Sequence, residues 1–310
     1  MSAIFLKILN MSAAASWIAA AVLLLRCCLK RAPKWVNVLL WGFVAVRLLL
    51  PFSIESTLSL LPRTEVIRPA VTNVPVQTAA APAIGTTAAA ASGAAASPLS
   101  IWTILAWVWL AGAAVLLLYG AVSSLCLHRR VREAVRLRGN IYQSEHIDSP
   151  FVLGTICPKI YLPYHMDSCG WQYVIAHEQA HLRRGDHLWK PLGFLLLTIH
   201  WFNPLMWLSY VLLCRDIELA CDEKVIQDLE CGQRADYMQA LVSCSVNRRR
   251  IAACPLAFGE IGVKERVKSV MNYKKPTLWV TLLAAALCVV LAGCFLTCLL
   301  YTSDAADERS

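Results

Sequence analysis

Residues 188–214 read LWKPLGFLLLTIHWFNPLMWLSYVLLC, and they decide how the rest of the chain is arranged. If this apolar stretch crossed a membrane, the residues before it and after it would lie on opposite sides. Asn203-Pro204 interrupts it, because this pair favours a turn and proline removes a helical hydrogen bond. Each half is shorter than the about 20 residues that a bilayer core requires. The sequence therefore predicts an apolar helical hairpin over 188–214, with both of its flanks on one side of the membrane.

Just before this hairpin, residues 177–181 read HEQAH, an H-E-x-x-H motif. On a helix, His177 and His181 lie on one face about one turn apart, so both imidazoles can reach one metal ion. Glu178 can take a proton from a metal-bound water as that water attacks a peptide carbonyl. So short a pattern also arises by chance in helices, so a third ligand is the test of a metal site.

A candidate third ligand follows the hairpin, where residues 215–223 read RDIELACDE. A catalytic zinc ion usually takes three protein ligands and keeps its fourth position for water. On a helix Glu218 and Asp222 share a face, so Glu218 can bind the metal while Asp222 hydrogen-bonds a ligating histidine. The same helix would point Cys221 away from this face. A solvated acidic helix face is the competing interpretation, and the preceding H-E-x-x-H motif favours the metal site.

Two short runs upstream of the motif predict a small β-sheet. Residues 149–154 (SPFVLG) and 159–163 (KIYLP) are rich in β-branched and aromatic side chains and are separated by Gly154 and Pro158. In zinc peptidases an edge strand beside the metal commonly aligns the substrate backbone by main-chain hydrogen bonds. A purely structural hairpin is an equal alternative. The candidate substrate-binding residues are Phe151, Val152, Leu153 and Gly154.

The composition indicates an α-helical integral membrane protein. Of 310 residues, 58% are hydrophobic and only 16% charged, and the mean hydropathy is +0.54, too apolar for an ordinary soluble domain. Four apolar runs, 4–25, 36–50, 101–127 and 278–296, predict transmembrane helices. The predicted order is transmembrane helices 1 and 2 in 1–55, an extracellular low-complexity linker in 56–98, helix 3 in 99–127, a peptidase domain in 128–275 and helix 4 in 276–297.

Basic residues orient this array. They cluster after the first run, after the third run and before the fourth: Arg26, Lys30, Arg31 and Lys34; Arg129, Arg130, Arg132, Arg136 and Arg138; Lys264, Arg266, Lys268, Lys274 and Lys275. The positive-inside rule makes these clusters cytoplasmic, which puts the N-terminus outside the cell membrane and the H-E-x-x-H motif in the cytoplasm. Topology and anionic lipid headgroups account for the net charge of +9, so we expect a lipid bilayer and no direct nucleic acid as partner.

The motifs SPFVLG…PKIYLP, HEQAHLRRGD, NPLMW and RDIELACDE, in this order, resemble the BlaR/MecR-type membrane zinc metallopeptidases, which are β-lactam sensor-transducers. The resemblance implies a gluzincin-like, α-rich domain with a small sheet, in which His177, His181 and Glu218 hold zinc, Glu178 is the base and Asp222 supports a ligating histidine. It also implies an endopeptidase of transmembrane signalling that cleaves itself or a cytoplasmic regulator, such as a repressor, in response to an extracellular signal.

Other features depart from that pattern or leave alternatives open. The S-x-x-K, S-D-N and K-T-G motifs of a penicillin-binding sensor domain are absent, so the resemblance does not extend to β-lactam sensing. We interpret 298–310 as sequencing-adapter sequence, which would leave an extracellular domain out of this chain. The alternative functions are an HtpX/Ste24-type quality-control or processing peptidase and a catalytically silent transducer. A second copy of the chain is a further candidate partner.

Overall fold

The computed structural model describes residues 1–50, 54–55, 101–164, 170–246, 263–295 and 297–298. The predicted linker over 56–98 and most of the adapter-like segment lie outside them. The helices are α1 (Ser2–Cys28), α2 (Lys34–Leu49), α3 (Ile101–Arg130), α4 (Trp171–Arg184), α5 (Asp186–Ile199), α6 (Pro204–Ile226), α7 (Cys231–Val246), α8 (Val263–Met271) and α9 (Leu278–Phe295). The strands are β1 (Ile54–Glu55), β2 (Val135–Arg138), β3 (Ile141–Ser144), β4 (Phe151–Leu153), β5 (Lys159–Pro163) and β6 (Thr297–Cys298).

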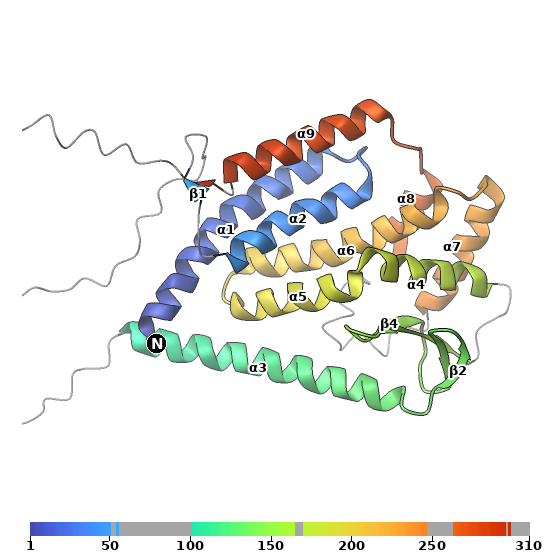
Figure 1. Cartoon of the computed structure of the whole chain (residues 1–310), viewed down its shortest axis with the longest axis horizontal. Coiled ribbons are helices and arrows are strands. Elements are labelled where there is room, and N and C mark those ends of the chain that lie inside the picture. Colours follow the sequence, from blue (N-terminus) through green and yellow to red (C-terminus); the bar gives the residue numbers. More distant parts are fainter. Residues whose placement is uncertain (51–53, 56–100, 165–169, 247–262, 296, 299–310) are drawn as a thin grey trace, which may run out of the picture.

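Two of the described helices, α1 with 27 residues and α3 with 30, are long and apolar enough to cross a membrane. The other two expected spans form shorter helices: α2 has 16 residues, and the apolar part of α9 covers Leu278–Gly293. Together with α5 and α6, these helices pack into one bundle, in which α2 lies against both α1 and α6 (Figure 1). The core shared by α1, α2, α5, α6 and α9 contains Ile18, Leu40, Trp41, Tyr210 and Cys214.

The chain turns at Asn203, between α5 and α6. The Asn203 side chain caps α6 by accepting a hydrogen bond from the Leu205 amide at 2.9 Å. Its amide nitrogen donates to the Ser12 and Ser16 hydroxyls of α1, both at 2.8 Å, which ties the turn to α1. The second helix of the hairpin is longer than expected, because α6 continues without a break to Ile226. The apolar half and the acidic segment with Glu218 are therefore one rigid helix.

The small sheet predicted from the sequence is confirmed, and it is larger than expected. Its strand order is β2-β3-β5-β4, with β3 and β5 parallel and the other pairs antiparallel. The two predicted runs form β4 and β5. Strand β2 is fully exposed, and its four residues, VRLR, lie within a basic stretch that we interpreted only as a signal of membrane topology. Strand β4 lies at the sheet edge and contacts α4.

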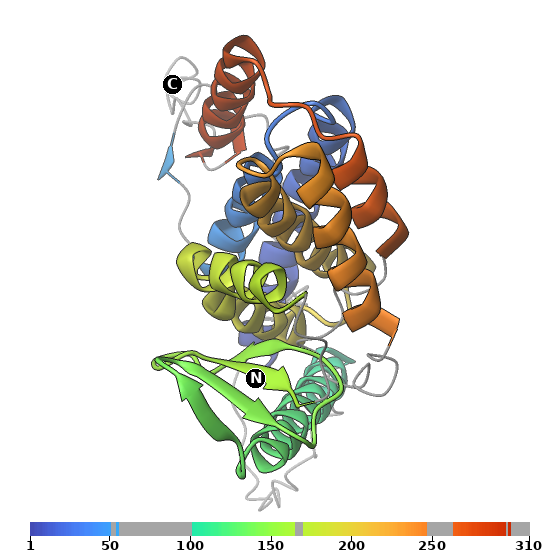
Figure 2. The ribbon, with the colours of Figure 1, turned by 90° about the vertical axis from the view of Figure 1, so that its right-hand side faces the viewer.

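Helix α4 lies between the sheet and the helical bundle, as the two views show (Figures 1 and 2). One side of α4 packs on the sheet through Val174, which joins Ile160 and Leu162 of β5 in a small core. Other parts of α4 contact α6, α7 and α5. The H-E-x-x-H helix is thus enclosed by elements from separate parts of the sequence, and its polar face is removed from water.

Candidate metal centre

Two histidines of α4 converge at the start of the site. His177 and His181 are both buried, and their Nε2 atoms lie 3.2 Å apart. The helix ends one turn later at Gly185, whose φ of 72° is in the left-handed region that favours glycine, and α5 begins at once with Asp186. This tight connection fixes the first residues of α5 beside the histidines.

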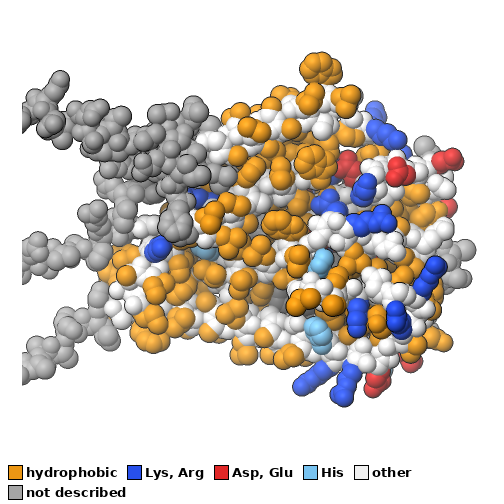
Figure 3. Space-filling model, in the orientation of Figure 1, with side chains coloured by type: hydrophobic (Ala, Val, Ile, Leu, Met, Phe, Trp, Pro, Cys, Tyr) orange, Lys and Arg blue, Asp and Glu red, His pale blue; other side chains and the backbone are white. Residues whose placement is uncertain are grey.

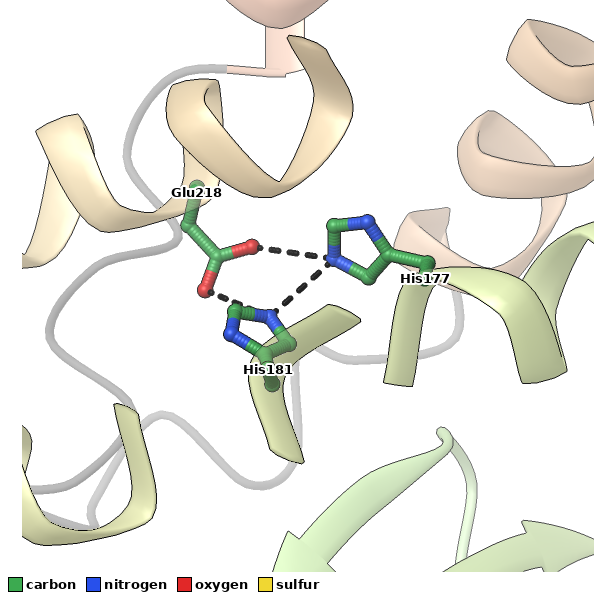
Figure 4. Close-up of side chains that lie close together, drawn as sticks. All are labelled: His177, His181 and Glu218. Carbon is green, nitrogen blue, oxygen red and sulfur yellow. Dashed lines mark hydrogen bonds and ion pairs between the residues drawn. The ribbon is translucent and has the colours of Figure 1, made fainter. Parts of the chain in front are cut away.

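Glu218 of α6 completes a group of three potential ligands (Figure 4). Its Oε2 lies 3.4 Å from His177 Nε2, and its Oε1 lies 3.6 Å from His181 Nε2. One atom from each residue falls within 4.8 Å of the others, so a single ion can contact all three. Two imidazole nitrogens and a carboxylate are a donor set that suits a catalytic zinc ion, so the residues fit that metal.

Each histidine ring also has a polar partner at its other nitrogen, Nδ1. The Tyr237 hydroxyl donates to Asp222 Oδ1 at 2.7 Å and lies 3.0 Å from His177 Nδ1, while Asp222 Oδ1 is itself 3.3 Å from that nitrogen. Asp186 Oδ2 lies 2.9 Å from His181 Nδ1. When Nδ1 of each neutral ring donates to these partners, its Nε2 lone pair faces Glu218, as a metal ligand requires. Asp222 lies where the sequence placed it, and Asp186 and Tyr237 are additional.

The expectation that Cys221 points away from the site is wrong. Its thiol sulfur lies 3.2 Å from His181 Nδ1 and 3.1 Å from Asp186 Oδ2, where it donates to that carboxylate. The site encloses α6 on more than one side, so residues one position apart can both reach it, Asp222 toward His177 and Cys221 toward His181. Burial raises the pKa of the Cys221 thiol to about 11, so it stays protonated near neutral pH.

Two basic residues neutralise the acidic groups. Lys190 of α5 donates to Glu218 Oε1 at 2.8 Å, and Arg266 of α8 donates to both carboxylate oxygens of Asp222, at 2.8 and 2.7 Å. Burial acts to raise the pKa of Glu218, but Lys190 and the two histidines outweigh it and hold that pKa well below its usual value. Burial likewise acts to raise the pKa of Asp222, but the charge and hydrogen bonds of Arg266 outweigh it, so that pKa is also lowered. Both carboxylates are therefore ionised at neutral pH.

The remaining predicted residues lie on α4 and on, or directly after, the edge strand that contacts it. Glu178 is buried on α4 directly after His177. Phe151, Val152 and Leu153 form the edge strand β4 against α4, and Gly154 follows with a φ of 106°. Lys190, Tyr237 and Arg266 were not foreseen as site residues, since nothing in their local sequence indicates that α5, α7 and α8 converge on α4.

Comparison with known proteins shows the family of the chain. The sequence matches the family described as BlaR1 peptidase M56 over residues 6–270. It is 30% identical over 141 residues to the methicillin resistance mecR1 protein of Staphylococcus aureus, a match covering 43% of this chain and 24% of that protein. It is 26% identical over 194 residues to the regulatory protein BlaR1 of Bacillus licheniformis, which covers 54% of this chain and 32% of that protein. The matched region thus spans a third or less of these relatives, but the family match extends over most of the chain, which therefore belongs to the BlaR1 peptidase M56 family.

Proposed function

We propose that this chain is a membrane-embedded zinc metalloendopeptidase that acts in transmembrane signalling. In response to an extracellular signal it cleaves itself, a cytoplasmic regulator such as a repressor, or both. The observation that carries the proposal is the convergence of His177, His181 and Glu218, from two helices, beside the buried Glu178. The family membership and the names of the relatives, a resistance protein and a regulatory protein, support signalling over quality control.

The residues of the site divide the work of peptide hydrolysis. Zinc bound by His177, His181 and Glu218 would supply a Lewis acid and an activated water. Glu178 takes the proton from the attacking water and returns it to the leaving amine. Asp186 keeps the His181 ring oriented with its Nε2 toward the ligand cluster, and Tyr237 does so for His177.

The edge strand β4 is the proposed binding site for the substrate backbone. A peptide in extended conformation can add to the free edge of the sheet, using the main chain of residues 151–154. Because β4 contacts α4, a peptide bound there would run past the helix that carries Glu178.

The proposed location is the cell membrane, with the site on the cytoplasmic side. The length and apolarity of α1 and α3 support spanning by these two helices, and we propose that α2 and α9 span as well. In this proposal the first two spans lie in 1–55, the third in 99–127 and the fourth in 276–297. The peptidase domain covers 128–275, and its apolar hairpin packs against the membrane.

A Glu178→Gln variant tests the enzymatic part of the proposal. Purified wild type should contain zinc by mass spectrometry and should process itself or a fluorogenic peptide library. The variant should retain the zinc and lose at least about 100-fold in cleavage rate, the usual contribution of a general base. Glu145→Gln, at an exposed position in the peptidase domain, is the matched control and should cleave normally. Equal cleavage by wild type and Glu178→Gln would favour the catalytically silent transducer.

A further inference from the structure

Asp216 is a buried carboxylate of α6 that the proposed mechanism does not use. It lies two residues before Glu218 and is 0% exposed. Arg26, near the end of α1, donates to it from Nε and Nη2, both at 2.8 Å, and the Trp41 indole of α2 donates at 2.9 Å. A buried carboxylate is costly unless it is paired and hydrogen-bonded, and these three donors satisfy it. The cluster therefore joins α1 and α2 firmly to the helix of a metal ligand.

A second contact joins α2 to α6 at Glu223, about two helical turns after Asp216. Glu223 accepts a hydrogen bond from the backbone amide of Lys34, the first residue of α2, at 2.5 Å. Asp216 and Glu223 thus bracket Glu218 and Asp222 in the sequence. Residues at the end of α1 and in α2 therefore hold α6 at both ends of its site-forming part.

Helical geometry separates these contacts from the metal centre. At about 100° of rotation per residue, Asp216 and Glu223, seven positions apart, project from nearly the same side of α6. By the same rotation Glu218 and Asp222 project from nearly the opposite side. Helix α6 lies between α2 and α4 (Figure 1), so one side faces the α1–α2 pair and the other faces the histidines.

We propose that Asp216, held by Arg26 and Trp41, is a positioning residue for the metal ligand Glu218. A ligand must be held within about 0.5 Å and 10–20° of its working geometry, and a rigid helix transmits a rotation at one residue to its neighbours. The position of the α1–α2 pair then sets how well Glu218 meets His177 and His181. This inference rests on the proposed function, and it gives an incoming signal at the membrane helices a physical route to the metal.

The structure offers a matched control for this role. A different link between α1 and α6, from Asn203 to the Ser12 and Ser16 hydroxyls, lies at the other end of α6. Thirteen residues separate Asn203 from Asp216, about 20 Å at 1.5 Å per residue. Loss of that link weakens the packing of the same two helices but leaves the donors to Asp216 and Glu223 in place.

The experiment measures metal binding by the full chain in detergent micelles after removal of metal with a chelator. Zinc affinity comes from competition with a chromophoric chelator, and the ligand geometry comes from the visible spectrum of the Co²⁺ form. Asp216→Asn should lower zinc affinity about 10-fold or more and change the Co²⁺ spectrum. Arg26→Gln should do the same, and Arg26→Lys, which keeps the charge, should recover part of the loss. The Ser12→Ala/Ser16→Ala control should leave affinity and spectrum unchanged.

Lys34→Pro provides a second route if Asp216→Asn does not fold. Pro33 has φ −54° and ψ 136°, the conformation that a following proline requires, and the first position of a helix accepts proline. The variant removes the amide that donates to Glu223, which should lower zinc affinity about fivefold, the equivalent of one hydrogen bond.

Two outcomes would overturn the positioning role: zinc affinity and Co²⁺ spectrum unchanged in both Asp216→Asn and Lys34→Pro, or an equal loss in the serine control. His181→Ala separates this failure from that of the proposed function. If His181→Ala abolishes metal binding, the proposed metal site is supported even when Asp216→Asn has no effect. A wild-type protein that binds neither Zn²⁺ nor Co²⁺ would refute both the positioning role of Asp216 and the proposed function.

Discussion

Asp186 is the first residue of α5, and its Oδ2 lies 2.9 Å from His181 Nδ1. It also accepts a hydrogen bond from the Cys221 thiol, so it joins the start of α5 to both His181 of α4 and Cys221 of α6. A carboxylate behind a ligating histidine orients the ring and raises its basicity. We expect Asp186→Asn to lower zinc affinity by about 10- to 100-fold in a chelator competition titration. Asp228→Asn, at an exposed position after α6, is the control, and an equal affinity in both variants would contradict the role of Asp186.

The protonation of the ligands predicts how zinc binding depends on pH. Burial acts to lower the pKa of His181, but the ionised Glu218 and Asp186 carboxylates outweigh it and raise that pKa well above its usual value. Glu218, with its lowered pKa, is already ionised. Since zinc binds only neutral imidazole, binding releases a proton from His181 and none from Glu218.

Zinc affinity should therefore fall as the pH drops through the His181 pKa, by about tenfold per pH unit for one displaced proton, and level off above that pKa. Calorimetric titration in buffers of different ionisation enthalpy counts the released protons directly. An affinity that stays constant from mildly acidic to neutral pH would show that the ligands are deprotonated before the metal arrives.

At the scale of elements, local periodicity accounts for what the sequence could predict. His177, His181, Glu218 and Asp222 follow helical spacing within two segments, and Asn203-Pro204 marks the turn that brings those segments together. The strands β4 and β5 have a distinct apolar composition, which made them recognisable. Each of these features depends on residues close together in the chain.

The rest depends on packing between distant elements. Arg266 reads as part of a basic cluster beside a membrane span, yet α8 places it on Asp222. Lys190 lies in an apolar run, and Tyr237 lies in α7. Cys221 was misplaced because one helix face was assumed to serve the site, whereas Cys221 and Asp222 reach different histidines. Spacing within a single helix cannot indicate how many neighbours surround it.

The hairpin of β4 and β5 depends on the backbone at Gly154. Its φ of 106° is unfavourable for other residues, and a Cβ there would lie 2.8 Å from the Cys157 carbonyl oxygen. Gly154→Ala should destabilise the protein by about 1–3 kcal/mol and lower its melting temperature in detergent. Gly139→Asn is the comparison, because Gly139 has a φ of 56° in open space, which asparagine tolerates. Similar melting temperatures for the two variants would mean that the hairpin adapts to a side chain at position 154.

At the scale of the whole molecule, the surface has two zones (Figure 3). Hydrophobic side chains cover the helical bundle, and many large ones are exposed on α3 and α9, among them Trp107, Val115, Leu118 and Trp279. Charged side chains gather at the other end, over the sheet and the helices around the metal centre. Exposed apolar surface of this extent fits contact with lipid, and the charged zone fits an aqueous compartment. The helices α4, α7 and α8, which contribute to the metal centre, therefore lie at the charged end.

The two zones and the basic clusters lead to a prediction of orientation. An epitope tag placed before Ser2 reports on the N-terminal end of α1, and one placed within the exposed turn at Gly139 reports on the side of the sheet. In intact cells an added protease should remove the N-terminal tag and leave the Gly139 tag, which should be lost only after permeabilisation, because basic segments stay in the cytoplasm. An intact cytoplasmic marker controls for leakage. Loss of the Gly139 tag from sealed cells would place the metal centre outside and would exclude a cytoplasmic substrate.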